Sequence, residues 1–374
     1  MRLNPAAWLR ARRVARETVR EYVARHAGAA GAGSCETIHA EAVAENPLPC
    51  NVASRDDLPA DRGWWGFSFA DVPSRRSGET FIATIPDCRV VWYRDETRGH
   101  DFYPAILAGD GRALDLREIR FRPRHAETLR RAPAAARLPR ATWILERVYH
   151  NHSHWLTAHL PKLLLLRDRQ ALGDVLLPQE RTPAIDGSLR LLGFDPCGFP
   201  SFDPNRPLRV GELTILGTDR FRPELLRLVQ RSAASAAGAA PRRRVFISRA
   251  RASRRRLVNE EGVWPLLDRA GFERVCMEEL SFEAQASLMR ETAVLCAPHG
   301  AGLTNMMFCA PGTHVIEIAD LGFPNPNFYA LASALGHRYW LVSADSLGDC
   351  HPLEKDLRVE PGAVSGVLRA LEAA

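Results

Sequence analysis

The chain has 374 residues, 46% of them hydrophobic and 25% charged, which excludes a disordered protein and predicts two domains with a large buried core. Lysine and arginine (50) exceed aspartate and glutamate (44) by six, too modest an excess to indicate nucleic-acid binding by itself. The eight cysteines form no C-x-x-C pair, and no apolar run reaches the roughly 18 residues that span a bilayer. We therefore expect reduced core thiols and a cytoplasmic location.

Residues 1–34 are predicted to be a basic N-terminal helix followed by a Gly/Ala linker. The first 27 residues carry seven arginines and two glutamates, with Trp8 and Tyr22 on a loose apolar face. Such a helix could make peripheral contact with an anionic inner membrane. A helix packed on its own domain, or a tail, explains the pattern equally well.

Residues 35–210 read as an N-terminal α/β domain of low regularity, which we assign to the acceptor side. The segment 35–78 is rich in Pro, Asp and Arg, has little periodicity, and receives no function. Short β-like runs follow, together with one helical run at 155–167. The β-like runs lie at 80–84, 88–92, 105–107, 142–146 and 189–193.

Residues 211–374 alternate between apolar β-like runs and helical runs. Strands that are apolar throughout and alternate with helices predict a parallel sheet covered on both faces, a doubly wound α/β domain. The predicted strands lie at 212–216, 244–247, 274–277, 293–297, 314–318 and 339–342, and the helices at 222–233, 260–270, 282–290 and 303–308. Right-handed crossovers bring the carboxyl ends of the strands to one edge, where ligands bind.

The stretch 297–305, A-P-H-G-A-G-L-T-N, is typical of a phosphate site. It reads as the end of a buried strand, a turn pinched by Gly300 and Gly302, and the first turn of a helix. Free N–H groups at a helix start favour an anion, and His299 could add a donor. A tight strand-to-helix connection without any ligand remains the alternative.

Two further strand ends carry charge. Arg249 and Arg255 follow the run at 244–247 and could hold a phosphate through their guanidinium groups. Glu317 lies inside an apolar run, so it needs a partner, either a ribose hydroxyl or an internal arginine. Because G-x-G-x-x-G, the P-loop pattern and Asp-x-Asp are all absent, we expect a nucleotide diphosphate site without a metal or other cofactor.

Several motifs in this order and spacing resemble glycosyltransferase family 61: V-F-I-S-R at 245–249, Arg255 with Asn259 and Glu260, Phe282 with Gln285, and P-H-G-A-G-L-T-N-M at 298–306 through Glu317. The resemblance implies a GT-B architecture of two Rossmann-like domains facing a cleft, an inverting reaction, and a nucleotide-sugar donor held by the C-terminal domain. Bacterial members are usually linked to capsular or cell-surface polysaccharide synthesis, and eukaryotic ones transfer xylose or N-acetylglucosamine. The donor-binding residues expected here are Arg249, Arg255, His299, Gly300, Ala301, Gly302, Leu303, Asn305 and Glu317.

The run Y-H-N-H-S-H-W-L at 149–156, followed by Leu-Pro-Lys, is similar to a second motif of that family. The family's acidic residue falls on Ala158 here, and Lys162 replaces an arginine. Because an imidazole can accept a proton near neutral pH, His154 is the leading catalytic base, with His152 and His159 behind it. Histidines at 150, 152 and 154 could instead bind a metal on one strand face, or cap the following helix.

The predicted function is transfer of a hexosyl or pentosyl group from a nucleotide sugar to a hydroxyl of a growing glycan. Ala158 prompts an alternative, a catalytically lapsed subunit that binds nucleotide sugar or polysaccharide. The arginines at 249–256 prompt a nucleic-acid-associated protein, but no interleaved aromatic residues or helix-turn-helix accompany them. Donor sugar, base, acceptor, linkage and oligomeric state are not assigned.

Overall fold

The chain folds into two compact units, each assembled from two stretches of sequence. The N-terminal unit comprises Met1–Glu41 and Gly78–Arg220, and the C-terminal unit comprises Ala42–Ser77 and Phe221–Ala374. The computed structural model describes residues 14–28, 33–95, 101–131, 133–234 and 240–373. Residues 42–77, expected in the N-terminal domain, thus pack with the C-terminal unit, and the second boundary falls ten residues later than predicted.

The N-terminal unit contains a seven-stranded sheet with the path β1-β7-β6-β5-β11-β8, and β2 also pairs with β5. Its long central strand β5 runs antiparallel to β2, β6 and β11, while β11–β8 and β1–β7 are parallel. The strands are β1 Arg16–Thr18, β2 Ser34–His39, β5 Thr80–Asp95, β6 Asp101–Leu107, β7 Ala113–Asp115, β8 Ala136–Trp143 and β11 Leu208–Gly217. A mixed, mainly antiparallel sheet corrects the prediction of a Rossmann-like N-terminal domain, because hairpin connections replace helical crossovers.

The helices of the N-terminal unit are α2 Val19–Arg25, α3 Pro123–Arg131, α4 His152–His154, the π-helical turn η4 Trp155–His159, α5 Leu160–Asp168 and α6 Pro183–Leu191. Thr182 caps α6, accepting a hydrogen bond from the Ile185 N–H, and Pro183 occupies its first turn. The predicted strand at 189–193 is therefore the end of a helix. A parallel two-stranded sheet, β9 Leu177–Pro178 with β10 Ser201–Phe202, completes the unit.

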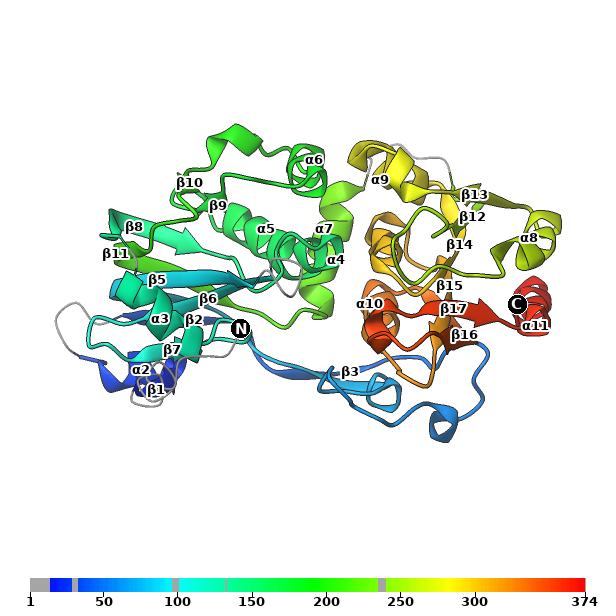
Figure 1. Ribbon diagram of the computed structural model, residues 1–374, viewed down its shortest axis with the longest axis horizontal. Coiled ribbons are helices and arrows are strands. Elements are labelled where there is room, and N and C mark those ends of the chain that lie inside the picture. Colours follow the sequence, from blue (N-terminus) through cyan, green and yellow to red (C-terminus); the bar gives the residue numbers. More distant parts are fainter. Residues whose placement is uncertain (1–13, 29–32, 96–100, 132, 235–239, 374) are drawn as a thin grey trace. The chain divides into compact units, whose positions relative to one another are not determined.

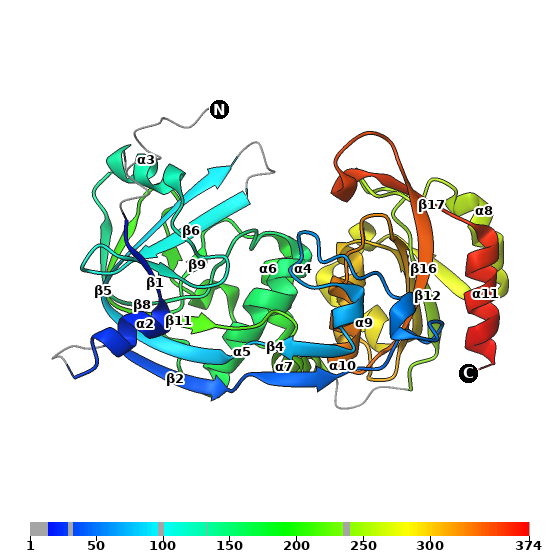
Figure 2. The ribbon, with the colours of Figure 1, turned by 90° about the horizontal axis from the view of Figure 1, so that it is seen from below.

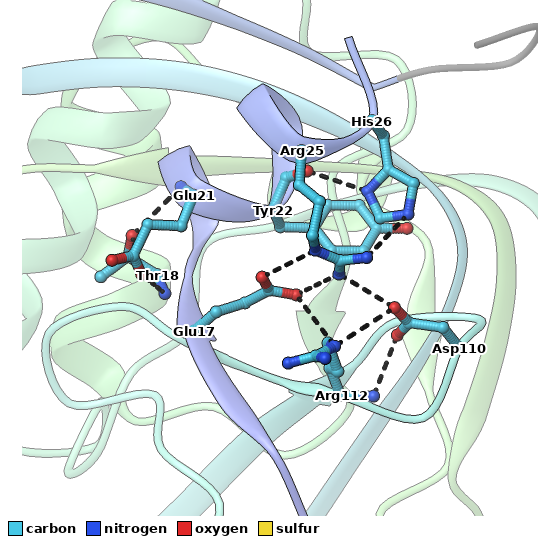
Figure 3. Close-up of polar contacts among 8 residues, drawn as sticks. All are labelled: Glu17, Thr18, Glu21, Tyr22, Arg25, His26, Asp110 and Arg112. Atoms are coloured by element: carbon cyan, nitrogen blue, oxygen red, sulfur yellow. Dashed lines mark hydrogen bonds and ion pairs between the residues drawn. The ribbon is translucent and has the colours of Figure 1, made fainter.

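The described part of the basic N-terminal segment is bound to its own unit (Figure 3). Arg25 pairs with Glu17 and, at 2.9 Å, with Asp110, which follows β6. Arg16 pairs with Asp115 at 2.7 Å, and Arg20 pairs with Glu79. The arginines at 16, 20 and 25 therefore have carboxylate partners, and the predicted membrane contact falls mostly on residues 1–13, outside the described part.

The C-terminal unit is built on a six-stranded sheet in the order β13-β12-β14-β15-β16-β17 (Figure 1). Every neighbouring pair is parallel except β16–β17, as predicted for a doubly wound sheet. The strand predicted at 212–216 is an exception, because it belongs to β11 of the N-terminal sheet. The strands are β12 Arg243–Ile247, β13 Phe272–Val275, β14 Thr292–Pro298, β15 His314–Asp320, β16 Arg338–Leu347 and β17 Asp356–Val359. Burial on both faces explains their unbroken apolar character.

Helices cover both faces of this sheet. One face packs on α8 Glu260–Arg269 and α11 Pro361–Glu372, which share an apolar core with the strands (Figure 2). The other helices are α7 Pro223–Ala233, α9 Phe282–Arg290 and α10 Asn327–Leu335. The 3-10 helix η7 Ala301–Phe308 lies between β14 and β15. In the described part of the chain, no helix is both long and apolar enough to cross a membrane.

Residues 42–77 are held on the C-terminal unit by specific hydrogen bonds. The segment forms a small antiparallel pair, β3 Ala42–Glu45 with β4 Ser74–Ser77. The side chain of Asn51 bonds both the N–H and the C=O of Leu341 in β16, at 3.0 and 2.7 Å. The Cys50 N–H donates to Tyr339 O at 2.7 Å, and the Tyr329 hydroxyl donates to Pro47 O at 2.6 Å. The segment therefore covers part of β16 that β17 leaves unpaired.

Candidate functional site

The strand order of the C-terminal unit defines where a ligand should bind. The chain passes from β12 outward to β13 and then returns to β14 on the other side of β12. The carboxyl ends of β12 and β14 therefore flank the switch point, the crevice where doubly wound sheets bind their ligands. Arg249 and Arg255 follow β12, and His299 follows β14.

Arg255 is the most unusual residue at this edge. Its φ of 57° lies in the left-handed region that side-chain-bearing residues rarely adopt. Its buried Nε has no hydrogen-bond partner among the described residues. Burial, together with the nearby charges of Arg249 and Arg254, lowers the pKa of Arg255 to about 10. A strained, incompletely satisfied cation surrounded by like charge is what an anion-binding site requires.

Arg249 supports the loop that carries Arg255. Its Nε donates to the Arg255 carbonyl and its Nη2 donates to the Arg254 carbonyl, both at 2.8 Å. A Cβ on Gly300 would lie 2.2 Å from Arg249 Nη1, so only glycine leaves room for this guanidinium. Of the two predicted phosphate ligands, Arg255 faces the site, while Arg249 mainly positions it.

A small hollow, here called the basic hollow, joins the ends of three strands. It is lined in part by Arg255, His299, Asp320, Phe323, Asn325 and Lys355. Arg255 and His299 were predicted to share a phosphate site, and the structure brings both into this one cavity. Asp320, Phe323, Asn325 and Lys355 were not singled out, because Asp320 ends a strand and the other three lie on loops without periodicity.

His299 is oriented by a buried carboxylate. Its Nδ1 contacts Glu317 Oε1, and the Tyr339 hydroxyl donates to Glu317 Oε2 at 2.6 Å. Glu317 is fully buried, so its partners are His299 and Tyr339 rather than the ribose or arginine that we expected. Burial and the adjacent Glu317 raise the pKa of Tyr339 well above its usual value, which keeps this hydroxyl a donor.

The hydrogen-bond network also assigns the tautomer of His299. Asn325 Oδ1 accepts from the Asn327 N–H at 3.1 Å, which directs Asn325 Nδ2 toward His299 Nε2, also at 3.1 Å. Nε2 is then an acceptor, and Nδ1 carries the proton toward Glu317.

The remaining predicted donor residues shape the turn from inside. Leu303 and Asn305 are buried in η7 at 1% and 0% exposure, and Asn305 Nδ2 donates to Gln285 Oε1 at 2.9 Å. A Cβ on Gly302 would lie 3.3 Å from Ile247 Cγ2, so this glycine permits close packing on β12. Four of the predicted donor residues therefore stabilise the turn after β14 and do not line the basic hollow: Ala301, Gly302, Leu303 and Asn305.

The N-terminal unit contains a buried charged cluster around Glu146. Its carboxylate accepts from Lys162 Nζ at one oxygen and from Arg117 Nε at the other, at 2.8 Å. Although burial opposes ionisation, the charges of Arg117 and Lys162 lower the pKa of Glu146 to about 2. Lys162, predicted only as a departure from the family motif, thus neutralises a carboxylate in the core.

His159 and His154 lie beside this cluster, but neither presents a free lone pair. His159 is fully buried; its Nε2 accepts from the Glu146 N–H and its Nδ1 donates to His154 O, both at 3.0 Å. Burial lowers the pKa of His159 to about 3, so it is neutral and structural. This corrects its assignment as a reserve base.

One ring nitrogen of His154 accepts a hydrogen bond from Arg220, which leaves the other nitrogen as a donor. Its Nε2 lies 3.4 Å from Nη1 of Arg220, a group that can only donate. Burial and Arg220 hold the pKa of His154 well below its usual range. The neutral ring therefore carries its proton on Nδ1, which has no partner among the described residues. His152 lies in the first turn of α4, half-buried.

Glu118 is a titratable residue beside this cluster that the sequence did not single out. It occupies the turn between Leu116 and Ile119, whose backbones bond each other in both directions at 3.0 and 2.8 Å. Its Oε2 is buried without a hydrogen-bond partner in the described part of the chain. Burial raises the pKa of Glu118, against the opposing charge of Arg117, and Arg147 and Arg220 lie within electrostatic range. No motif marks it, because it lies in an isolated turn.

The metal-site alternative is not supported. His152 and His154 lie on a helix, where positions two apart point to different sides, and not on a strand. Among the described residues, no three His, Cys, Asp or Glu side chains gather as a metal-ligand set. 

The fold and the basic hollow define an α/β protein with a hollow lined by Arg255, His299 and Lys355 at the switch point of a doubly wound sheet. Comparison with known proteins supports a family: residues 152–316 match the model of glycosyltransferase 61. The chain is also 29% identical over 97 residues to a beta-1,2-xylosyltransferase of Arabidopsis thaliana, a match that covers 22% of this chain and 18% of the plant protein. The chain thus spans about a fifth of that relative's length. Both findings support a glycosyltransferase of family 61.

Proposed function

We propose that this protein is an inverting, metal-independent glycosyltransferase whose donor site lies in the doubly wound C-terminal unit. It would move a sugar from a nucleotide-sugar donor to a hydroxyl of a growing cell-surface or capsular glycan. The observation that carries the proposal is Arg255, a half-buried residue with a strained backbone and a buried Nε, which lies in one hollow with His299 at the switch point of the sheet. The family match over 152–316 includes both residues.

The proposed reaction is a single displacement at the anomeric carbon. The acceptor oxygen forms a bond to this carbon while the bond from carbon to the phosphate oxygen breaks, and the electron pair leaves with the nucleoside diphosphate. The guanidinium of Arg255 opposes the negative charge that grows on the leaving oxygen, and His299, held by Glu317, lines the same hollow. In this proposal Arg255 takes the place that a bridging metal has in other transferases.

The acceptor hydroxyl must lose a proton, and we propose Glu118 rather than His154 as the group that takes it. Among the described residues Glu118 Oε2 is a buried acceptor without a partner, whereas the unpartnered Nδ1 of His154, also buried, carries a proton. A carboxylate whose pKa burial has raised is a stronger base than an exposed one. His154 would instead donate a hydrogen bond to the acceptor sugar.

Replacement of Arg255 by alanine tests the donor site. A charge-assisted hydrogen bond contributes about 1.5–3 kcal/mol, so R255A should weaken nucleoside diphosphate binding by roughly 10- to 150-fold in titration calorimetry. The matched control is R254A: Arg254 is exposed and pairs with Glu354 outside the hollow, so it should bind normally. Equal binding by R255A and wild type would remove the phosphate role.

The alternative, a lapsed nucleotide-sugar or polysaccharide-binding subunit, is prompted by Ala158. Incubation with a panel of nucleotide sugars separates the two proposals. An active transferase releases nucleoside diphosphate slowly by donor hydrolysis even without an acceptor, and a pure binding subunit releases none. The cytoplasmic location and an inner-membrane contact stay predictions.

A further inference from the structure

An aromatic cluster lies at the rim of the basic hollow and has no part in the proposed chemistry. Trp64 is 64% exposed, which is unusual for the largest apolar side chain. It belongs to the segment 42–77, to which the sequence assigned no function. Its neighbours are Phe323 and His351, and these three residues are called here the aromatic platform.

The platform is ordered although it is exposed. The Trp64 ring meets Phe323 edge to face, with centroids 5.9 Å apart and planes at 84°, and lies 4.7 Å from His351. Trp65 makes a second edge-to-face contact with Phe323, with ring centroids 6.3 Å apart. Edge-to-face contacts of this kind fix the orientation of a ring, so Trp64 is held while much of its surface stays open.

Phe323 links the platform to the phosphate-binding residues. It lines the basic hollow together with Arg255 and His299, and the hollow continues to Pro352 and Leu353, next to His351 in sequence. The basic hollow therefore has Arg255 among its lining residues and the aromatic platform at its rim. Both ends belong to the C-terminal unit.

We propose that Trp64 stacks against the nucleobase of the donor, while Arg255 and His299 hold its diphosphate. This inference rests on the proposed function, which supplies a ligand with an anion next to a planar ring. A base offers a flat π-face to Trp64, and the Asp320 carboxylate in the same hollow can accept a hydrogen bond from the nucleoside. The otherwise unexplained segment 42–77 would thereby contribute to base recognition.

The test measures binding of four nucleoside diphosphates (of uridine, guanosine, cytidine and thymidine) and of inorganic pyrophosphate by titration calorimetry. For wild type, at least one nucleoside diphosphate should bind more tightly than pyrophosphate. W64A should lose roughly 5- to 150-fold for that nucleotide, since stacking on one aromatic ring contributes about 1–3 kcal/mol. Its pyrophosphate affinity should not change, and W64F, which keeps an aromatic face, should restore most of the loss.

Each other outcome has a defined meaning. Unchanged nucleoside diphosphate affinity in W64A overturns base stacking and leaves the phosphate site standing. A loss seen only with the complete nucleotide sugar places the sugar, not the base, on Trp64 and also overturns the proposal. Failure of wild type to bind pyrophosphate or any nucleoside diphosphate overturns the proposed function itself. Because Trp64 is exposed, W64A should melt at the wild-type temperature, and this measurement serves as the folding control.

Discussion

At the scale of single residues, the proposed base Glu118 lies far in sequence from the position where the family motif has an acid. Position 158 is a buried alanine in the π-helical turn, where the family motif has an acid. The buried carboxylates near this turn are Glu146 and Glu118, which the charges of Arg117 and Arg220 connect to His154. Glu146 is neutralised by two cations, so only Glu118 keeps an oxygen without a partner.

Glu118→Gln should therefore lower kcat by roughly 10²- to 10⁴-fold, the usual effect of removing a general base. Nucleoside diphosphate binding should stay at the wild-type value, because Glu118 belongs to the other unit. Wild-type activity should fall with decreasing pH as the Glu118 carboxylate takes up a proton, and burial moves this limb above the usual carboxyl range. Steady-state kinetics across pH measure both effects.

The control is Glu212→Gln, which removes an exposed carboxylate from β11 in the same unit. It should change neither kcat nor the pH profile. Wild-type kcat in E118Q would show that the proton leaves by another route. A lower kcat with an unchanged acid limb would indicate a role for Glu118 in positioning rather than in proton transfer.

At the scale of elements, the sequence predicted best where periodicity is strong. Helix 282–290 was predicted to the residue, and β12 and β14 within one residue at either end, because unbroken apolar strands alternate with amphipathic helices. The π-helical turn at Trp155–His159 could not be predicted, since it depends on tertiary hydrogen bonds of His159 to Glu146 and His154. The fully internal partners of Glu317 were missed for the same reason.

The π-helical turn should make stability depend on pH. The His159 imidazole binds a proton below about pH 6.5 when unfolded, but only near pH 3 when folded. Unfolding between these values takes up a proton, so the free energy of unfolding should fall as the pH is lowered, by up to about 1.4 kcal/mol per pH unit for this one group. Urea unfolding at several pH values between 6 and 5 measures how the free energy of unfolding changes with pH. Glu146 stays ionised in the folded protein over this range, because its pKa is about 2.

His159→Gln should be less stable at every pH, yet its slope should be shallower than that of wild type. Loss of hydrogen bonds alone would shift the whole curve without changing its slope, so the slope isolates the proton. His125 and His337 are also buried with a pKa lowered to about 4, and burial lowers the pKa of His154 too, so these histidines should contribute to the slope that remains. An identical slope in H159Q would show that His159 is not the linked group.

For the whole molecule, the two units do not correspond to two continuous halves of the sequence. The chain crosses from one unit to the other after residues 41, 77 and 220, so each unit depends on two separate segments. Composition predicted two domains, but the exchange of residues 42–77 depends on side-chain bonds such as Asn51 to Leu341, which have no periodic signature. All the residues that we assign to the donor lie in one unit, and Glu118 lies in the other.

This division predicts that the C-terminal unit can bind nucleotide without the N-terminal unit. The Gly78 N–H donates to Asp219 Oδ2 at 3.1 Å, so the chain leaves and re-enters the N-terminal unit at neighbouring points. A short Gly/Ser linker should therefore join 42–77 directly to 221–374. The joined chain should fold and bind nucleoside diphosphate as the full protein does, but transfer no sugar because Glu118 is absent. Residues 221–374 alone should aggregate, since removal of 42–77 uncovers Tyr329 and the backbone of Leu341. A joined chain that folds but does not bind nucleotide, while the full protein does, would show that the donor site needs the N-terminal unit.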